Sequence, residues 1–100
     1  MASKTEKNWT VNSYVNSEWT DLVSEPSTVA SIIISANSET FVSIRLEDSG
    51  DVKATLLPLV LVGESEAYSF DIRSLNITGT QRLQVLSTSA GVSFTASGVV

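Results

Sequence analysis

Apolar residues recur at every second position over most of this chain. In the segment 40–48, for example, Val42, Ile44 and Leu46 alternate with polar side chains. Alternation with a period of two is typical of β-strands that bury one face. No window of ten residues shows the apolar stripe of an amphipathic helix. The pattern therefore predicts an all-β protein.

Turn-forming residues divide the alternating stretches into seven or eight strands of similar spacing. Such spacing is typical of an antiparallel β-sandwich, and we expect one that is Ig-like or jelly-roll-like. Residues 1–8 are polar and predict a flexible N-terminal arm, which leaves residues 9–100 as a single domain. The strands are expected near residues 9–11, 19–23, 28–36, 40–48, 52–56 with a continuation over 59–62, 68–72, 82–88 and 92–97.

Four local features predict how these strands connect. The short polar segment 37–39 predicts a hairpin between the strands on either side of it. Gly50 lies in a turn, where it is placed to take a positive φ. Pro58 has no backbone N–H and therefore marks an edge strand, a bulge or a strand end. The segment 73–76 is expected to form a short corner, with a single 3₁₀ turn as one option.

The composition limits the classes of partner. The chain has 100 residues, a net charge of −5 and six scattered basic residues. Nucleic acids and anionic membranes attract clustered Lys and Arg, so we expect neither as a partner. The first residues lack the apolar stretch of a signal peptide, and the longest apolar run, 56–62, is far shorter than the ~20 residues of a membrane-spanning helix. Because the chain has no Cys, it fits folding in a reducing cytoplasm.

The side chains of most enzyme and metal sites are missing from the sequence. There is no His, no Cys, no Gly-x-Ser-x-Gly motif and no Gly-rich phosphate loop. We therefore expect no catalytic site, no cofactor and no metal. Glu47, Asp48 and Asp51 form an acidic cluster that would suit Ca²⁺. A solvated turn is the favoured interpretation of this cluster, since Asp is a common turn former.

Three aromatic residues, Trp9, Tyr14 and Trp19, lie near the N-terminus. Such rings can form a stacking surface for a sugar or a partner, or they can cover the core and its edges. The second interpretation is favoured. The first leaves a carbohydrate-binding or host-binding module as an alternative function.

Four large apolar residues fall out of phase with the predicted core and are expected to point away from it. Exposed together, they would form an unfavourable patch on a soluble monomer, so they predict a subunit interface or a surface covered by the N-terminal segment. Covering them would contribute about 6–10 kcal/mol before the costs of association. We favour the interface, and hence a homo-oligomer. Its candidate residues are these four, Ile33, Phe41, Leu57 and Leu86, together with Trp9 and Trp19.

A resemblance to a known class of protein covers residues 28–98. The segments that carry it are 31–36, Leu61–Ser65, Phe70–Gly79, Leu83–Val85 and Ala90–Gly98. They resemble small β-sandwich virion structural proteins of tailed bacteriophages, of the head-decoration, neck or tail-accessory type. The shared feature is a pattern of turns and strands without a catalytic signature. Residues 1–27 do not share it.

The resemblance implies a non-enzymatic structural role in a virion. The expected function is capsid decoration (cement) by an oligomer, with a neck, head–tail, tail or fibre accessory protein as the alternative. The implied partners are further copies of the chain, with a trimer favoured, and other virion proteins such as the major capsid protein. The protein would be made in the cytoplasm of the bacterial host and end in the virion.

Overall fold

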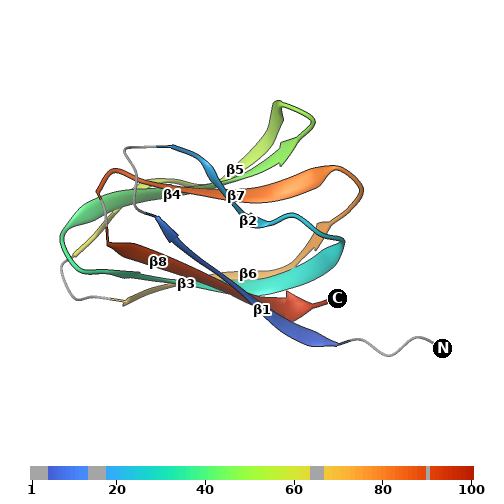
Figure 1. Cartoon of the computed structure of the whole chain (residues 1–100), viewed down its shortest axis with the longest axis horizontal. Coiled ribbons are helices and arrows are strands. Elements are labelled where there is room, and N and C mark those ends of the chain that lie inside the picture. The colour runs from blue at the N-terminus through green and yellow to red at the C-terminus, as the bar shows by residue number, and fades with distance from the viewer. Residues whose placement is uncertain (1–4, 14–17, 64–66, 90) are drawn as a thin grey trace.

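The computed structural model describes residues 5–13, 18–63, 67–89 and 91–100 (Figure 1). Within these ranges the regular elements are all β-strands, and they form two four-stranded sheets. These ranges include no helix that could cross a membrane. The strands are β1 (Glu6–Ser13), β2 (Thr20–Val23), β3 (Ser27–Ala36), β4 (Thr40–Asp48), β5 (Asp51–Val62), β6 (Ala67–Ile77), β7 (Gln81–Ser87) and β8 (Val92–Val99).

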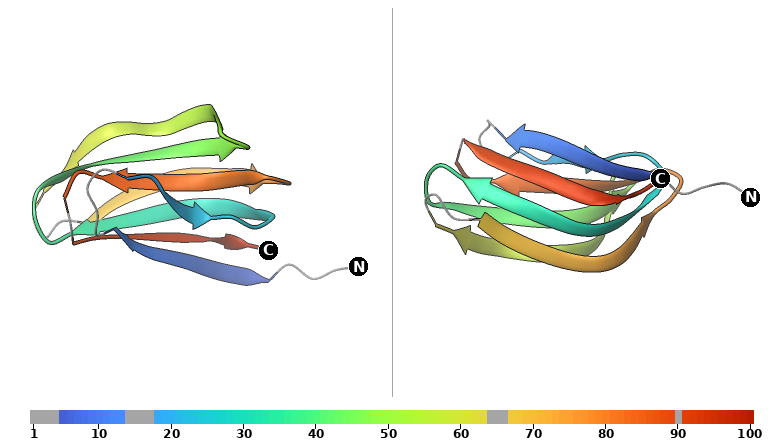
Figure 2. Two further views of the ribbon diagram at one scale, coloured as in Figure 1. Left: turned by 45° about the horizontal axis from the view of Figure 1, so that its top comes forward. Right: turned by 90° about the horizontal axis from the view of Figure 1, so that it is seen from below.

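The strands pair as one long antiparallel hairpin that is rolled up. β4 pairs with β5, β3 with β6, β2 with β7 and β1 with β8. Pairing of β8 with β3 and of β7 with β4 then completes the sheets β1-β8-β3-β6 and β2-β7-β4-β5, which form the two layers seen in Figure 2. This nested order is that of a jelly roll. The predicted antiparallel β-sandwich is confirmed, and the jelly-roll alternative is the one adopted.

The tip of the long hairpin is the turn between β4 and β5. Ser49 and Gly50 both have positive φ values, 53° and 95°, as in the type I′ turns that match the twist of two strands. The predicted conformation of Gly50 is confirmed. The Glu47 carboxylate accepts a hydrogen bond from the Gly50 N–H, and the Asp48 carboxylate accepts one from the Thr80 hydroxyl. The tip projects beyond the body of the sandwich (Figure 1).

The core lies between the inner faces of the two sheets. Phe94 is the largest of its fully buried side chains, and the next largest are Ile, Leu and Val. β-branched side chains suit the pleated surface of a strand, and removing their apolar area from water is the main favourable term in folding. The largest fully buried side chains are Val23, Val29, Ile32, Ile34, Val42, Ile44, Val62, Ile77, Leu83, Val85, Val92 and Phe94.

The predicted hairpin between residues 28–36 and 40–48 is wrong. β3 and β4 belong to different sheets, so the segment 37–39 carries the chain from one sheet to the other. The Asn37 N–H donates a hydrogen bond of 3.1 Å to the Gly91 carbonyl, which holds this crossing in place. Alternation shows that a strand has one buried face, but it does not show which strand lies beside it.

A bulge in β3 reverses the orientation expected for its first residues. The register shifts between Val29 and Ser31 against both neighbouring strands. Val29 is consequently buried and Ala30 is exposed, where the alternation predicts the opposite. On the neighbouring strand β6, Arg73 has a φ of 70°. The predicted corner at 73–76 is therefore a kinked stretch of strand, and the 3₁₀ option is wrong.

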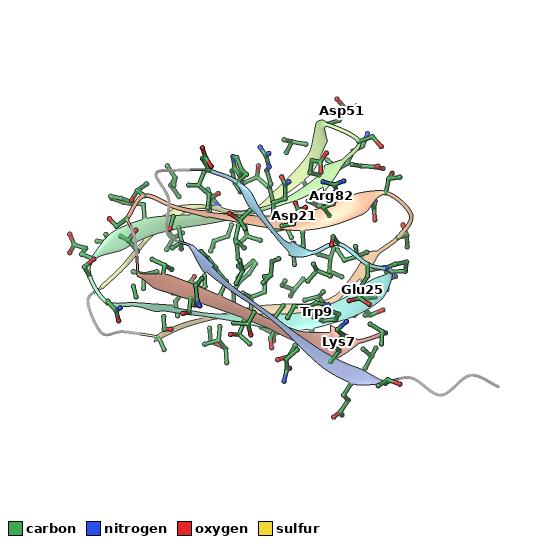
Figure 3. All side chains as sticks on the ribbon, in the orientation of Figure 1. Lys7, Trp9, Asp21, Glu25, Asp51 and Arg82 are labelled. Atoms are coloured by element: carbon green, nitrogen blue, oxygen red, sulfur yellow. The ribbon has the colours of Figure 1, made fainter. Side chains whose placement is uncertain are left out.

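β1 starts earlier than expected, and two of its side chains are hydrogen-bonded to Glu25. It begins at Glu6 and pairs with β8 from there, so the predicted arm 1–8 is too long; residues 1–4 lie outside the described ranges. Lys7 and the Trp9 indole both donate hydrogen bonds to Glu25, the latter at 2.9 Å. The three side chains are labelled in Figure 3. The hydrogen bonds from Lys7 and then Trp9 hold the pKa of Glu25 below its ordinary value of 4.5.

Replacing Glu25 by Gln removes the charge and keeps the shape of the side chain. Because folding lowers the pKa of Glu25, its carboxylate stabilises the fold above pH 4.5, and this contribution is lost as the pH falls through the folded-state value. We expect Glu25→Gln to be less stable than the wild type near pH 7, with a difference that shrinks toward about pH 3. Urea denaturation at both pH values measures this. A difference that is the same at both would contradict the role given to Glu25.

Gly98 allows β8 to pass close to the bulge of β3. A Cβ atom at this position would lie 2.0 Å from the backbone oxygen of Thr28, so the two strands would have to separate. We expect Gly98→Ala to lower the free energy of unfolding by about 3 kcal/mol or more. Gly79→Ala is the control, since a Cβ there meets nothing within 4 Å and its positive φ costs about 1 kcal/mol. Equal losses in chemical denaturation would argue against the close approach.

Candidate functional site

The predicted interface residues do not gather in one patch. Ile33 and Phe41 are exposed, by 48% and 47%. Each lies between two buried strand neighbours and so points outward, but the two lie on different sheets. Ile33 is on the outer face of β1-β8-β3-β6, and Phe41 is on the outer face of β2-β7-β4-β5. The thickness of the sandwich separates them.

The outward orientation predicted for Leu57 is wrong. Leu57 is 6% exposed and belongs to the core, where it pairs with Ile44. The register of β4 against β5 shifts on both sides of this pair, and each shift reverses the phase that simple alternation gives. Leu86 pairs with Ser43 on the outer face, as expected, but it is only 9% exposed.

Trp9 is buried in the core cluster, which confirms the interpretation that this ring covers the core. It therefore offers no open ring face to a sugar. Tyr14, another member of the aromatic group, lies outside the described residues.

Trp19 directly precedes β2 and is half-buried on the outer face of its sheet. The guanidinium carbon of Arg45 lies 4.0 Å from the centroid of its ring, a distance at which the cation and the ring attract each other. Because Thr20 pairs with Val85 in antiparallel register, the preceding Trp19 comes beside Leu86. This ring is thus part of the surface of the β-sheet and not a free platform.

Two exposed leucines, which the sequence pattern did not reveal, complete a patch on this face. Leu59 and Leu61 are 59% and 50% exposed. Leu61 pairs with Phe41 across β5 and β4, and Leu59, two residues earlier, points to the same side. Both lie in the apolar run 56–62, which only Pro58 interrupts and in which no alternation marks the outward positions. The patch, here called the apolar band, comprises Trp19, Phe41, Leu59, Leu61 and Leu86.

A polar network lies beside the apolar band. Arg45 Nε donates a hydrogen bond of 2.8 Å to Gln84 Oε1, and Gln84 Nε2 donates one of 2.9 Å to Asp21 Oδ1. Arg82 Nη1 lies 3.3 Å from Asp21 Oδ2, and Figure 3 shows both residues near β2 and β7. The network holds Arg45 in the position in which it stacks on Trp19.

The outer face of β1-β8-β3-β6 has a different chemistry. Ile33 pairs there with Ser69 on one side and with Thr95 on the other. The hydroxyls of Thr10 and Thr95 lie 3.4 Å apart. A single exposed apolar residue among hydroxyls is ordinary for a protein surface. The apolar band is therefore the stronger candidate for a functional surface.

The described carboxylates do not gather as a metal site requires. Glu47 and Asp48 accept hydrogen bonds from the turn and from Thr80, in keeping with the turn interpretation of this cluster. In the part of the chain that the structure describes, no three residues among His, Cys, Asp and Glu come together as a metal site requires. A hollow of about 610 Å³ lies beside β1 and β8, and Glu6 is the carboxylate in its lining. Hydrolysis of a glycosidic bond normally uses a pair of carboxylates in a cleft, and the described residues that line this hollow do not supply one.

Comparison with known proteins identifies no family for the chain. No protein-family model matches the chain, and no curated protein matches it. Among solved structures, the chain is similar to one titled "Crystal structure of PirA", with a TM-score of 0.48 and 16% sequence identity over 100% of this chain and 97% of that chain. A likeness at this level carries no argument about function.

Removing the Arg45 side chain tests the packing of this surface. Arg45→Ala deletes the stack on Trp19 and the stem that covers it, and we expect it to lower the free energy of unfolding by about 1 kcal/mol. Arg82→Ala is the control: its ion pair with Asp21 is exposed, so its loss should cost about 0.5 kcal/mol or less. Urea denaturation of the two variants measures the difference. If Arg45→Ala cost no more than the control, the stack would contribute nothing to stability.

Proposed function

We propose that the protein is a non-enzymatic structural component of a tailed-bacteriophage virion, specifically a capsid decoration (cement) protein that packs on the particle as an oligomer. The observation that supports a role in packing is the apolar band, in which Phe41, Leu59 and Leu61 each leave about half of the residue uncovered. Large apolar side chains that adjoin on one face of a sheet are characteristic of a contact surface. The protein would thus act by packing against its neighbours.

The size of the apolar band suits a weak contact that is repeated many times. Three half-exposed large side chains offer on the order of 300 Å² of apolar surface, which at about 25 cal/mol per Å² contributes about 7 kcal/mol when covered. Association costs about 4–15 kcal/mol, so one such contact holds two free molecules together only weakly. On a symmetric particle the contact recurs at high local concentration, and avidity makes it sufficient.

The assignment to a phage particle rests on the sequence resemblance of residues 28–98. The jelly roll is compatible with it because capsid domains use this fold, although lectin domains use it too. A carbohydrate- or host-binding module has less support, since Trp9 is buried and Trp19 is stacked with Arg45. The proposed partners are further copies of the chain and virion proteins such as the major capsid protein.

Mass spectrometry of purified particles tests the virion assignment. We expect the chain in the particle at a copy number comparable with that of the major capsid protein. A few copies per particle would favour the neck or tail alternative over decoration. Absence of the chain from the particle would contradict the proposal.

Binding of purified protein to particles that lack it tests the surface. Phe41→Ser should reduce the bound amount roughly tenfold or more, because it removes the centre of the apolar band and with it the contact between neighbouring copies that gives the bound protein its avidity. Ile33→Ser is the matched control, since Ile33 is equally exposed on the other outer face, and it should bind as the wild type does. If Ile33→Ser loses binding and Phe41→Ser does not, the contact lies on the other outer face and the assignment to the apolar band is wrong.

A further inference from the structure

We infer that the partner seated on the apolar band is a second copy of this chain, packed face to face about a two-fold axis. The inference rests on the proposed function, because it names the partner of the same surface. Three features of the outer face of β2-β7-β4-β5 lead to it: the edge of the sheet, the balance of charge and the size of the apolar area.

The free edge of β5 is poorly suited to pairing with a strand from another molecule. β5 is the last strand of its sheet, beside β4. Pro58 has no N–H to donate, as predicted for an edge or bulge position, and the pairing of β5 with β4 shifts register three times. Proline and bulges are the devices that keep edge strands from joining other chains. A neighbour therefore reaches the exposed leucines by covering the face and not by extending the sheet.

The outer face of this sheet is balanced in charge, although the chain as a whole is acidic. The net charge of −5 makes two copies repel each other in most orientations. On the part of this face that β2, β7 and β4 form, the register places two acidic and two basic strand residues. The acidic residues are Asp21 and Glu47, and the basic residues are Arg45 and Arg82. Because these four charges cancel, two copies that approach through this part of the face bring no net like charge together, and a strongly charged partner would gain nothing there.

The occupant of the apolar band must itself be apolar and uncharged where it makes contact. The apolar band of a second copy meets this requirement, since a two-fold axis places the same patch on both sides of an interface. Phe41, Leu59 and Leu61 of one copy would cover those of the other. The remaining outer face does not qualify, because Ile33 lies there among hydroxyls. Such a contact closes as a pair, which differs from the trimer expected from the resemblance.

The apolar area sets the expected strength of the pair. A stable interface buries about 800 Å² on each partner, and the exposed part of the apolar band supplies less than half of that. The pair is therefore weak in dilute solution, with a Kd on the order of 100 µM. It becomes populated where copies are concentrated, as on the surface of a particle.

Sedimentation equilibrium of the full chain, from about 10 µM to about 1 mM, tests the inference. The mean mass of the wild type should rise from 10.7 kDa toward twice that value. The double variant Leu59→Ser/Leu61→Ser should stay at 10.7 kDa throughout, as expected for association weakened by roughly tenfold or more. Ile33→Ser, the matched control on the other face, should associate as the wild type does.

Both leucines are exposed, so the double variant should keep the circular dichroism spectrum and melting temperature of the wild type. Leu59→Glu is a second variant that places like charges across the two-fold axis, and it should also abolish the pair. A wild type that is monomeric up to about 1 mM, or association that Ile33→Ser alone removes, overturns the inference. If the chain is a monomer that still binds particles through the apolar band, the second copy is not the partner, but the proposed function stands. The proposed function itself fails only if particles lack the chain.

Discussion

Each of the two sheets buries one face against the other sheet, and the rest of the structure depends on this constraint. Side chains such as Ile32, Ile44, Leu83 and Phe94 fill the layer between the sheets. Because side chains alternate along a strand, each buried residue sends its neighbours outward. The fold requires little of those outer positions beyond contact with water. Apolar residues that gather on an outer face therefore point to a contact beyond the chain itself.

Alternation in the sequence predicts most of the strands and the class of fold, and Gly50 predicts the tip of the long hairpin. It cannot predict which strands pair, because the jelly roll places β3 and β4 in different sheets although they follow each other in the chain. It also fails beyond each bulge, where the inward and outward phases exchange. Ala30 and Leu57 have the wrong predicted orientation for this reason. A bulge is set by pairing with a neighbouring strand, which the local pattern does not contain.

The sequence predicts the apolar band only in part, because the local pattern differs between the residues that form it. Phe41 stands out because its strand alternates in sequence, whereas Leu59 and Leu61 lie in an apolar run without alternation. Leu86 has the expected orientation, but its low exposure depends on strands distant in sequence. The result is a molecule with one hydroxyl-lined face and one face that combines an apolar band with a charge-balanced network. This asymmetry favours a protein that works by packing in a defined orientation.

Two-dimensional NMR of the wild-type chain over a dilution series measures most directly where the protein meets another copy. We expect the backbone amide signals that move with concentration to belong to Phe41, Leu59, Leu61 and their neighbours on the outer face of β2-β7-β4-β5. Signals around Ile33 should stay fixed. Movement centred on Ile33, or spectra that do not change with concentration, would contradict the central claim that this sheet face is the surface through which the protein assembles.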